Sequence, residues 1–155
     1  MGEFNLNGAS VSTELRGETP LINVLREHFG LFGTRFGCGA EQCGSCMVLI
    51  DGQAHYACTR TVDSVIGRDV VTVEGLGTTL APHPLQRAFL AEQAGQCGYC
   101  LSGMLISAAA LLRTNLAPTE PQVRAALENN LCRCGAHNRI VRAVLRAASE
   151  MSVRA

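Results

Sequence analysis

The chain has 155 residues, is 47% hydrophobic and carries a formal net charge of zero, which allows one ordinary domain or two small ones. The neutral charge balance gives no reason to expect nucleic acid or an anionic membrane surface as a partner. No apolar run reaches the roughly 18 residues that a bilayer span needs. The N-terminal MGEFNLNG lacks the basic and apolar segments of an export signal. We therefore expect a cytoplasmic protein, with association to the inner membrane through partners as the alternative.

The first half of the chain is predicted to be rich in β-strands. Residues 4–15 alternate in polarity around Asn7-Gly8, and residues 46–58 turn at Asp51-Gly52. Asn-Gly and Asp-Gly are the strongest short turn signals for β-hairpins. Residues 69–75 (DVVTVEG) predict a further strand that ends at its glycine.

One helix is expected among these strands, over residues 21–29, where the apolar residues recur on one face. Thr19 is the predicted N-cap, Pro20 fits the first helical position, and Gly30 follows the last turn.

The second half of the chain is predicted to be helical. A Gly-, Thr- and Pro-rich linker at 77–83 precedes four segments with helical periodicity. These segments span residues 85–94, 98–113, 119–127 and 136–151. Thr119 and Gln122 have the spacing of a capping box. The expected fold is therefore α+β, with a mixed domain at 1–76, a linker at 77–83 and a small four-helix bundle at 84–155.

Cysteine is the unusual feature of the composition. The eight cysteines occur in tight clusters, at positions 38, 43, 46, 58, 97, 100, 132 and 134. An even count is compatible with disulfides in an oxidising compartment. However, cysteines separated by only one or two residues pair poorly with each other and suit a shared metal centre. Metal binding is therefore the favoured interpretation.

The first cysteine set has the spacing C-x4-C-x2-C-x11-C, formed by Cys38, Cys43, Cys46 and Cys58. This is the plant-type ferredoxin pattern for a [2Fe-2S] cluster. Neighbouring glycines let the loop turn its N–H groups toward sulfur. Zinc is the alternative, but zinc sites usually use paired short knuckles. A thioredoxin-like dithiol at Cys43 and Cys46 leaves the other two cysteines unexplained.

The second cysteine set pairs Cys97 and Cys100 with Cys132 and Cys134. We expect Cys97 and Cys100 to open the 98–113 helix and the other pair to precede the last helix. Helix N-termini favour thiolates. Taken alone, the two pairs are also compatible with zinc, and C-x-x-C with a redox dithiol.

Two other cofactors fit the sequence poorly. The c-type haem motif is absent because no histidine follows C-x-x-C directly. A Rieske centre needs two histidine ligands, whereas both thiol quartets are already complete. We interpret the histidines as surface or packing residues; they are His28, His55, His83 and His137.

The motifs FGCGAEQCGSC, HPLQRAF, QCGYCLSGM and NLCRCG together resemble the small iron–sulfur subunit of the molybdenum hydroxylases, the xanthine dehydrogenase family. The resemblance covers nearly the whole chain. It implies a ferredoxin-like β-grasp domain with one [2Fe-2S] cluster and a helical domain with the other, the eight cysteines being the ligands. It also implies a large partner subunit that holds a molybdopterin cofactor, and places Gln96 on the side of the second cluster that faces the pterin.

This resemblance implies that the chain carries electrons away from substrate chemistry on the partner. That chemistry is hydroxylation of an N-heterocycle such as nicotinate, or aldehyde oxidation. The sequence itself shows no phosphate loop and no acid–base pair, so no catalytic residue is assigned. The residues GAHNRI after Cys134 resemble the two-component nicotinate and isoquinoline dehydrogenase branch, whose acceptor is often cytochrome c.

Three alternatives stay open: a subunit of a three-component enzyme with FAD, a free-standing two-cluster ferredoxin, and a structural zinc protein. A subunit should expose apolar surface around Gln96 and Tyr99. Arg133 and His137 receive no role from the sequence.

Overall fold

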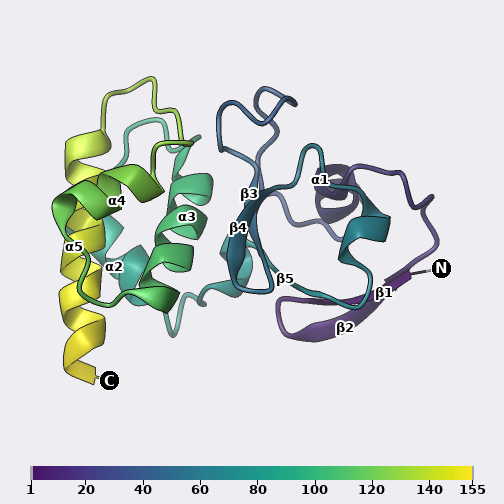
Figure 1. Cartoon of the computed structure of the whole chain (residues 1–155), viewed down its shortest axis with the longest axis horizontal. Coiled ribbons are helices and arrows are strands. Elements are labelled where there is room, and N and C mark those ends of the chain that lie inside the picture. The colour runs from purple at the N-terminus through teal and green to yellow at the C-terminus, as the bar shows by residue number, and fades with distance from the viewer. Residues whose placement is uncertain (1, 155) are drawn as a thin grey trace.

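The computed structural model describes residues 2–154. A β-sheet part and a helical part lie side by side, with α3 facing β3 and β4 (Figure 1). The sheet has five strands in the order β2-β1-β5-β3-β4. They are β1 (Gly2–Leu6), β2 (Ala9–Thr13), β3 (Met47–Ile50), β4 (Gln53–Tyr56) and β5 (Asp69–Val71). The α+β fold predicted from the sequence is confirmed.

Both predicted hairpins are present, because β1 pairs with β2 and β3 with β4 in antiparallel register. Their turns contain Asn7-Gly8 and Asp51-Gly52, all four at positive φ, which is the backbone of the favoured two-residue hairpin turn. The third predicted strand is only partly correct. β5 ends at Val71, and Val73–Gly75 forms a 3₁₀ helix, η3. β5 runs parallel to β1 and antiparallel to β3.

The predicted N-terminal helix is short and starts differently from the expectation. α1 (Leu21–Asn23) continues as a single π-helical segment, η1 (Val24–His28). Pro20 has ψ 133° and forms an isolated β-bridge with Thr61, so it stands outside the helix and Thr19 does not cap it. Gly30, at φ +67°, follows the helix as expected.

Strand β3 explains how the two parts of the molecule join. Its four residues are all buried, which is typical of a strand covered on both faces. Val48 and Ile50 pack with Leu21 and the rest of the core under α1, whereas Met47 and Leu49 pack against Ile106 of α3. The helical domain therefore covers one face of the sheet.

The helical part contains the four predicted helices: α2 (Pro84–Ala91), α3 (Leu101–Thr114), α4 (Glu120–Ala126) and α5 (His137–Arg154). A further 3₁₀ turn, η2 (Val62–Val65), lies in the sheet domain. The capping box predicted at the start of α4 is present, with the Gln122 side chain accepting from the Thr119 N–H at 2.8 Å. No helix among residues 2–154 is both long and apolar enough to cross a membrane.

Candidate iron–sulfur sites

The first cysteine set gathers at one end of the β3–β4 hairpin. Cys46 directly precedes β3 and Cys58 lies just beyond β4, and the hairpin register brings their thiols into hydrogen-bond contact. Cys38 and Cys43 lie on the loop before β3, where their thiols also contact each other. A local hairpin and a local loop thus each supply one thiol pair.

Backbone N–H groups surround Cys38 and Cys43, the outer and less buried pair of thiols. The N–H groups of Ala40 and Gln42 point at Cys38 Sγ from 3.4 and 3.2 Å, and that of Cys38 points at Cys43 Sγ from 3.4 Å. The loop achieves this with positive φ at Gly39 and at Glu41. The hydrogen bonds from Ala40 and Gln42 lower the pKa of the Cys38 thiol to about 7. The loop therefore favours the thiolate that an iron ligand must be.

The inner pair of thiols has the opposite environment. Cys46 and Cys58 are buried, and burial raises the pKa of Cys46 to about 12. A buried thiolate is stable only beside a positive ion, which takes the place of the proton. Space is also kept for sulfur at the outer pair, because a Cβ on Gly37 would lie 2.5 Å from Cys43 Sγ. These features fit an iron–sulfur cluster.

The second cysteine set lies where two loops meet at one end of the bundle. Cys97 contacts Cys134, and Cys100 contacts Cys132, each through the thiols. The expectation that Cys97 and Cys100 open a helix is only partly correct. Cys100 is the N-cap residue of α3, and Cys97 lies in the turn before it, where Gly98 has φ +78°. The chain must turn there, so the helix starts after the turn.

In this set too, backbone hydrogen bonds lower the pKa of some thiols and burial raises the pKa of another. The Tyr99 N–H lowers the pKa of Cys97. Burial acts to raise the pKa of Cys132, but N–H groups that include that of Ala136 outweigh it and the pKa is lowered. Burial raises the pKa of Cys100 to about 12. Each set therefore contains at least one thiol whose pKa is lowered and one buried thiol whose pKa is raised, and the buried thiolate needs a cation beside it.

Within residues 2–154, no three metal-ligating side chains converge closely enough to hold a single ion. The thiols approach each other in pairs instead. A [2Fe-2S] cluster has two irons, each taking two protein ligands, so two thiol pairs per site are the arrangement it requires.

Direct contacts join the two sites. The Leu131 N–H donates to the Cys43 carbonyl at 3.0 Å, and the buried Asn130 donates through Nδ2 to the Gly44 carbonyl at 3.2 Å. A Cβ on Gly103, in the first turn of α3, would lie 1.9 Å from the same Gly44 oxygen. Close packing of these backbones fixes the position of one cysteine loop against the other.

Arg35 makes a second connection that sequence reasoning missed. Its Nη1 donates to the Gly98 carbonyl at 2.7 Å, and its guanidinium lies 5.3 Å from the centre of the Tyr99 ring. No local pattern predicts a contact between residues 63 positions apart. The contact between α3 and Gly44 did leave a signal in the sequence. Gly103 lies inside the helical pattern of α3, and a glycine at such a position indicates that another part of the chain packs closely against the helix.

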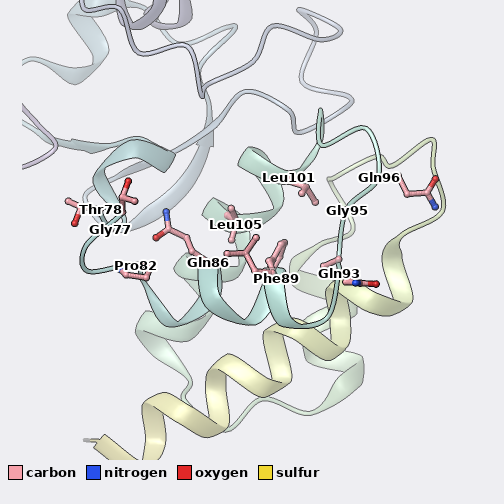
Figure 2. Close-up of a pocket in the computed structure, with 13 residues that line it drawn as sticks. Gly77, Thr78, Pro82, Gln86, Phe89, Gln93, Gly95, Gln96, Leu101 and Leu105 are labelled. Carbon is pink, nitrogen blue, oxygen red and sulfur yellow. The ribbon is translucent and has the colours of Figure 1, made fainter.

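Gln96 is exposed and lies beside the second site, its Nε2 donating to the Cys134 carbonyl at 3.4 Å. It also lines one end of a groove of about 650 Å³ between the linker and α2. Figure 2 shows Gln96 at one end of this groove and Gly77 and Thr78 at the other. Phe89, Leu101 and Leu105 supply much of its apolar lining.

The histidines occupy other positions. His83 caps α2, with Nδ1 accepting from the Leu85 N–H at 3.2 Å, and His28 packs edge-on against Phe29. His55 lies on β4 near Arg60. Burial lowers the pKa of both His55 and His83. His137 is the first residue of α5.

Comparison with known families defines the class of protein. Residues 4–68 match the model of a 2Fe-2S iron–sulfur cluster binding domain, and residues 72–145 match that of a [2Fe-2S] binding domain. The chain is therefore a protein with two [2Fe-2S]-binding domains.

Whole-chain relatives narrow the class further. The chain is 48% identical to a nicotinate dehydrogenase subunit of Pseudomonas putida over 145 residues, which cover 94% of this chain and 92% of that protein. It is 49% identical to the alpha subunit of isoquinoline 1-oxidoreductase from Brevundimonas diminuta over 151 residues, covering 97% and 99%. The chain belongs to the family of small iron–sulfur subunits of the molybdenum hydroxylases.

Solved structures agree with this placement. Quinoline 2-oxidoreductase from Pseudomonas putida 86 matches with a TM-score of 0.92 and 36% identity, over 98% of this chain and 94% of that one. Aldehyde oxidoreductase from Desulfovibrio gigas matches with a TM-score of 0.94 and 35% identity over all of this chain. The present chain spans only 18% of that longer protein.

Proposed function

We propose that the two cysteine sets are the ligands of the two clusters, one set for each. The observation that carries this proposal is the pairing of the thiols within each set, with backbone N–H groups directed at the sulfurs of Cys38 and Cys97. Cys38, Cys43, Cys46 and Cys58 would hold one cluster, and Cys97, Cys100, Cys132 and Cys134 the other. When bound, a [2Fe-2S] cluster takes up and releases one electron at a time.

The chain is an electron-transfer subunit that works with a larger catalytic partner. We infer that the Gln96 end of the molecule faces that partner and its molybdopterin. The exposed Gln96 amide bonds the Cys134 backbone and leaves hydrogen-bonding capacity directed outward. Apolar side chains next to the cysteines of the second set are also exposed, with Tyr99 49% and Leu131 60% accessible. Such surface is typical of a protein interface.

The groove beside Gln96 extends this proposed interface. Its lining is mainly apolar and contains amide side chains but no charged residue, and Leu90 at its rim is 78% exposed. A neutral, partly apolar groove suits a segment of the catalytic partner that presents apolar side chains and backbone hydrogen-bonding groups.

The acceptor would approach the other cluster. Cys38 is the exposed thiol of its set, and Phe36, Ala40 and Gln42 around it are exposed as well. We propose a cytochrome c or FAD partner at this loop. Electrons would then enter beside Gln96 and leave beside Cys38, with the Leu131–Cys43 hydrogen bond between the two sites.

For the substrate of the whole enzyme we propose an N-heterocycle of the nicotinate type, with an aldehyde as the second candidate. The names of the relatives at 48 and 49% identity support the first, and that of the aldehyde oxidoreductase relative in Escherichia coli, 37% identical, supports the second.

Isolation of the native complex tests the proposed function. The chain should copurify with a molybdenum-containing protein, and analysis for FAD and haem should identify the acceptor. Nicotinate, isoquinoline and an aromatic aldehyde are then compared for anaerobic bleaching of the cluster absorbance. A chain that carries clusters but purifies alone, without molybdenum, supports a free-standing ferredoxin instead.

A further inference from the structure

Arg35 and Tyr99 connect the two cysteine loops in both directions. Arg35 comes from the loop of the first set, and its guanidinium donates to the Gly98 carbonyl in the loop of the second set at 2.7 Å. Tyr99 comes from the second loop, and its hydroxyl donates to the Phe36 carbonyl in the first loop at 2.5 Å. The guanidinium and the Tyr99 ring also stack, at 5.3 Å.

These contacts place a permanent positive charge beside the second site. Arginine stays protonated at any physiological pH. Gly98 directly follows the ligand candidate Cys97, so a guanidinium on its carbonyl is held close to that residue. Arg35 is half-buried, which limits the screening of its charge by solvent and salt. Its charge is also one of the influences that lower the pKa of Cys97.

A charge in this position acts differently on the two oxidation states of the site. Reduction adds one negative charge, and a nearby cation stabilises the more negative state. Hydrogen bonding and charge around the sulfurs are among the factors that set the potential of iron–sulfur centres. The charge comes from one domain and acts on the ligands of the other, so the effect depends on how the two domains dock.

We propose that Arg35 is a positioning residue that raises the reduction potential of the cluster site formed by Cys97, Cys100, Cys132 and Cys134. This inference rests on the proposed assignment of those cysteines as ligands. Arg35 would make the site nearer the partner a better electron acceptor, and would have a smaller effect on the site that contains Cys38.

A purely structural role for Arg35 is the competing explanation. The loop before Arg35 already has its own support, since Arg26 Nη1 donates to the carbonyls of Phe32 and Thr34 at 3.0 and 2.9 Å. The Tyr99 hydroxyl also joins the two loops without any charge. The charge of Arg35 is therefore the property that the other contacts do not supply.

The test is a redox titration of the full chain with both clusters, followed by EPR. Arg35→Gln removes the charge and keeps a hydrogen-bond donor, whereas Arg35→Lys keeps the charge and loses the planar stacking group. Arg35→Met, which keeps an aliphatic chain over Tyr99, serves as a second neutral variant. Arg142→Gln is the matched control, because it removes the same charge from α5, where Arg142 pairs with Glu92 at 3.4 Å.

We expect Arg35→Gln and Arg35→Met to lower the reduced-to-oxidised ratio of the cluster at the second cysteine set about tenfold at a fixed potential, equivalent to 59 mV for a one-electron couple. In both variants the potential of the cluster at the first set should stay close to wild type. In Arg35→Lys and Arg142→Gln both potentials should stay close to wild type. Unchanged potentials in the neutral variants, or equal shifts in Arg35→Lys, would overturn the proposal. Absence of both cluster signals from the wild-type chain would instead refute the proposed function.

Discussion

Gly103 offers a direct test of how the two domains are held together. Its missing side chain lets the first turn of α3 approach the Gly44 carbonyl, and an added Cβ would lie 1.9 Å from that oxygen. To reach even 3.0 Å, the two backbones must separate by about 1.1 Å. The obstacle is backbone on both sides, so no side-chain rotation can relieve it.

The expected cost of Gly103→Ala combines two opposing effects. Overpacking typically costs about 1–3 kcal/mol, and a contact between backbones belongs at the upper end of that range. Alanine favours a helix over glycine by about 1 kcal/mol. The net destabilisation is therefore about 2 kcal/mol, which lowers the unfolding midpoint by roughly 4–8 °C for a chain of this size.

The assay is anaerobic thermal unfolding of the cluster-loaded chain, followed by far-UV circular dichroism and by visible cluster absorbance. Ser102→Ala is the matched control in the same helical turn. The Ser102 hydroxyl is buried and has no hydrogen-bond partner among the described residues, so its removal should leave stability unchanged or raise it by about 1 kcal/mol. A Gly103→Ala variant as stable as wild type would refute the close docking of α3 on the Gly44 loop.

Two further predictions concern buried polar contacts. Asn130→Ala removes the hydrogen bond to the Gly44 carbonyl and should destabilise the chain by about 1–3 kcal/mol, read as a lower unfolding midpoint; no change would show that the contact does not hold the loops. His83→Asn should keep the cap of α2 but weaken its pH dependence. Because burial lowers the pKa of His83, the unfolded state takes up the proton first as the pH falls. The contribution of His83 is thus present above about pH 6.5 and lost below it. Parallel stability–pH profiles for wild type and His83→Asn would contradict this.

Local signals made much of the fold predictable from the sequence. Asn7-Gly8 and Asp51-Gly52 each require positive φ at both positions, and both hairpins followed from that requirement. The helix positions followed from apolar periodicity, because each helix buries one face. The cysteine spacings separated two quartets for a similar reason, since Cys38, Cys43 and Cys46 lie in one short motif and Cys97–Cys100 and Cys132–Cys134 in two others.

The parts that could not be predicted depend on contacts between distant residues. Pro20 lies outside its helix because it bridges Thr61, and no local rule contains that partner. The bond between Asn130 and Gly44 joins residues 86 positions apart, and the Arg35–Gly98 contact joins residues 63 positions apart. These interactions appear only after the two domains have docked.

Domain docking therefore has a functional meaning in this chain. The buried face of β3 meets α3 on one side of the molecule, and the same interface continues to the Cys43–Leu131 and Gly44–Asn130 bonds. A single packed interface thus sets both the position of the domains and the relation between the two proposed clusters.

The central claim is that the chain holds two separate [2Fe-2S] clusters on two cysteine quartets. EPR of the dithionite-reduced chain, with iron and sulfide analysis, tests it most directly when wild type is compared with Cys58→Ser and Cys132→Ser. The wild type should show two distinct signals and about four irons per chain. Each variant should lose one signal, a different one in each case. Loss of both signals in either variant, or an EPR-silent chain that contains zinc, would contradict the claim.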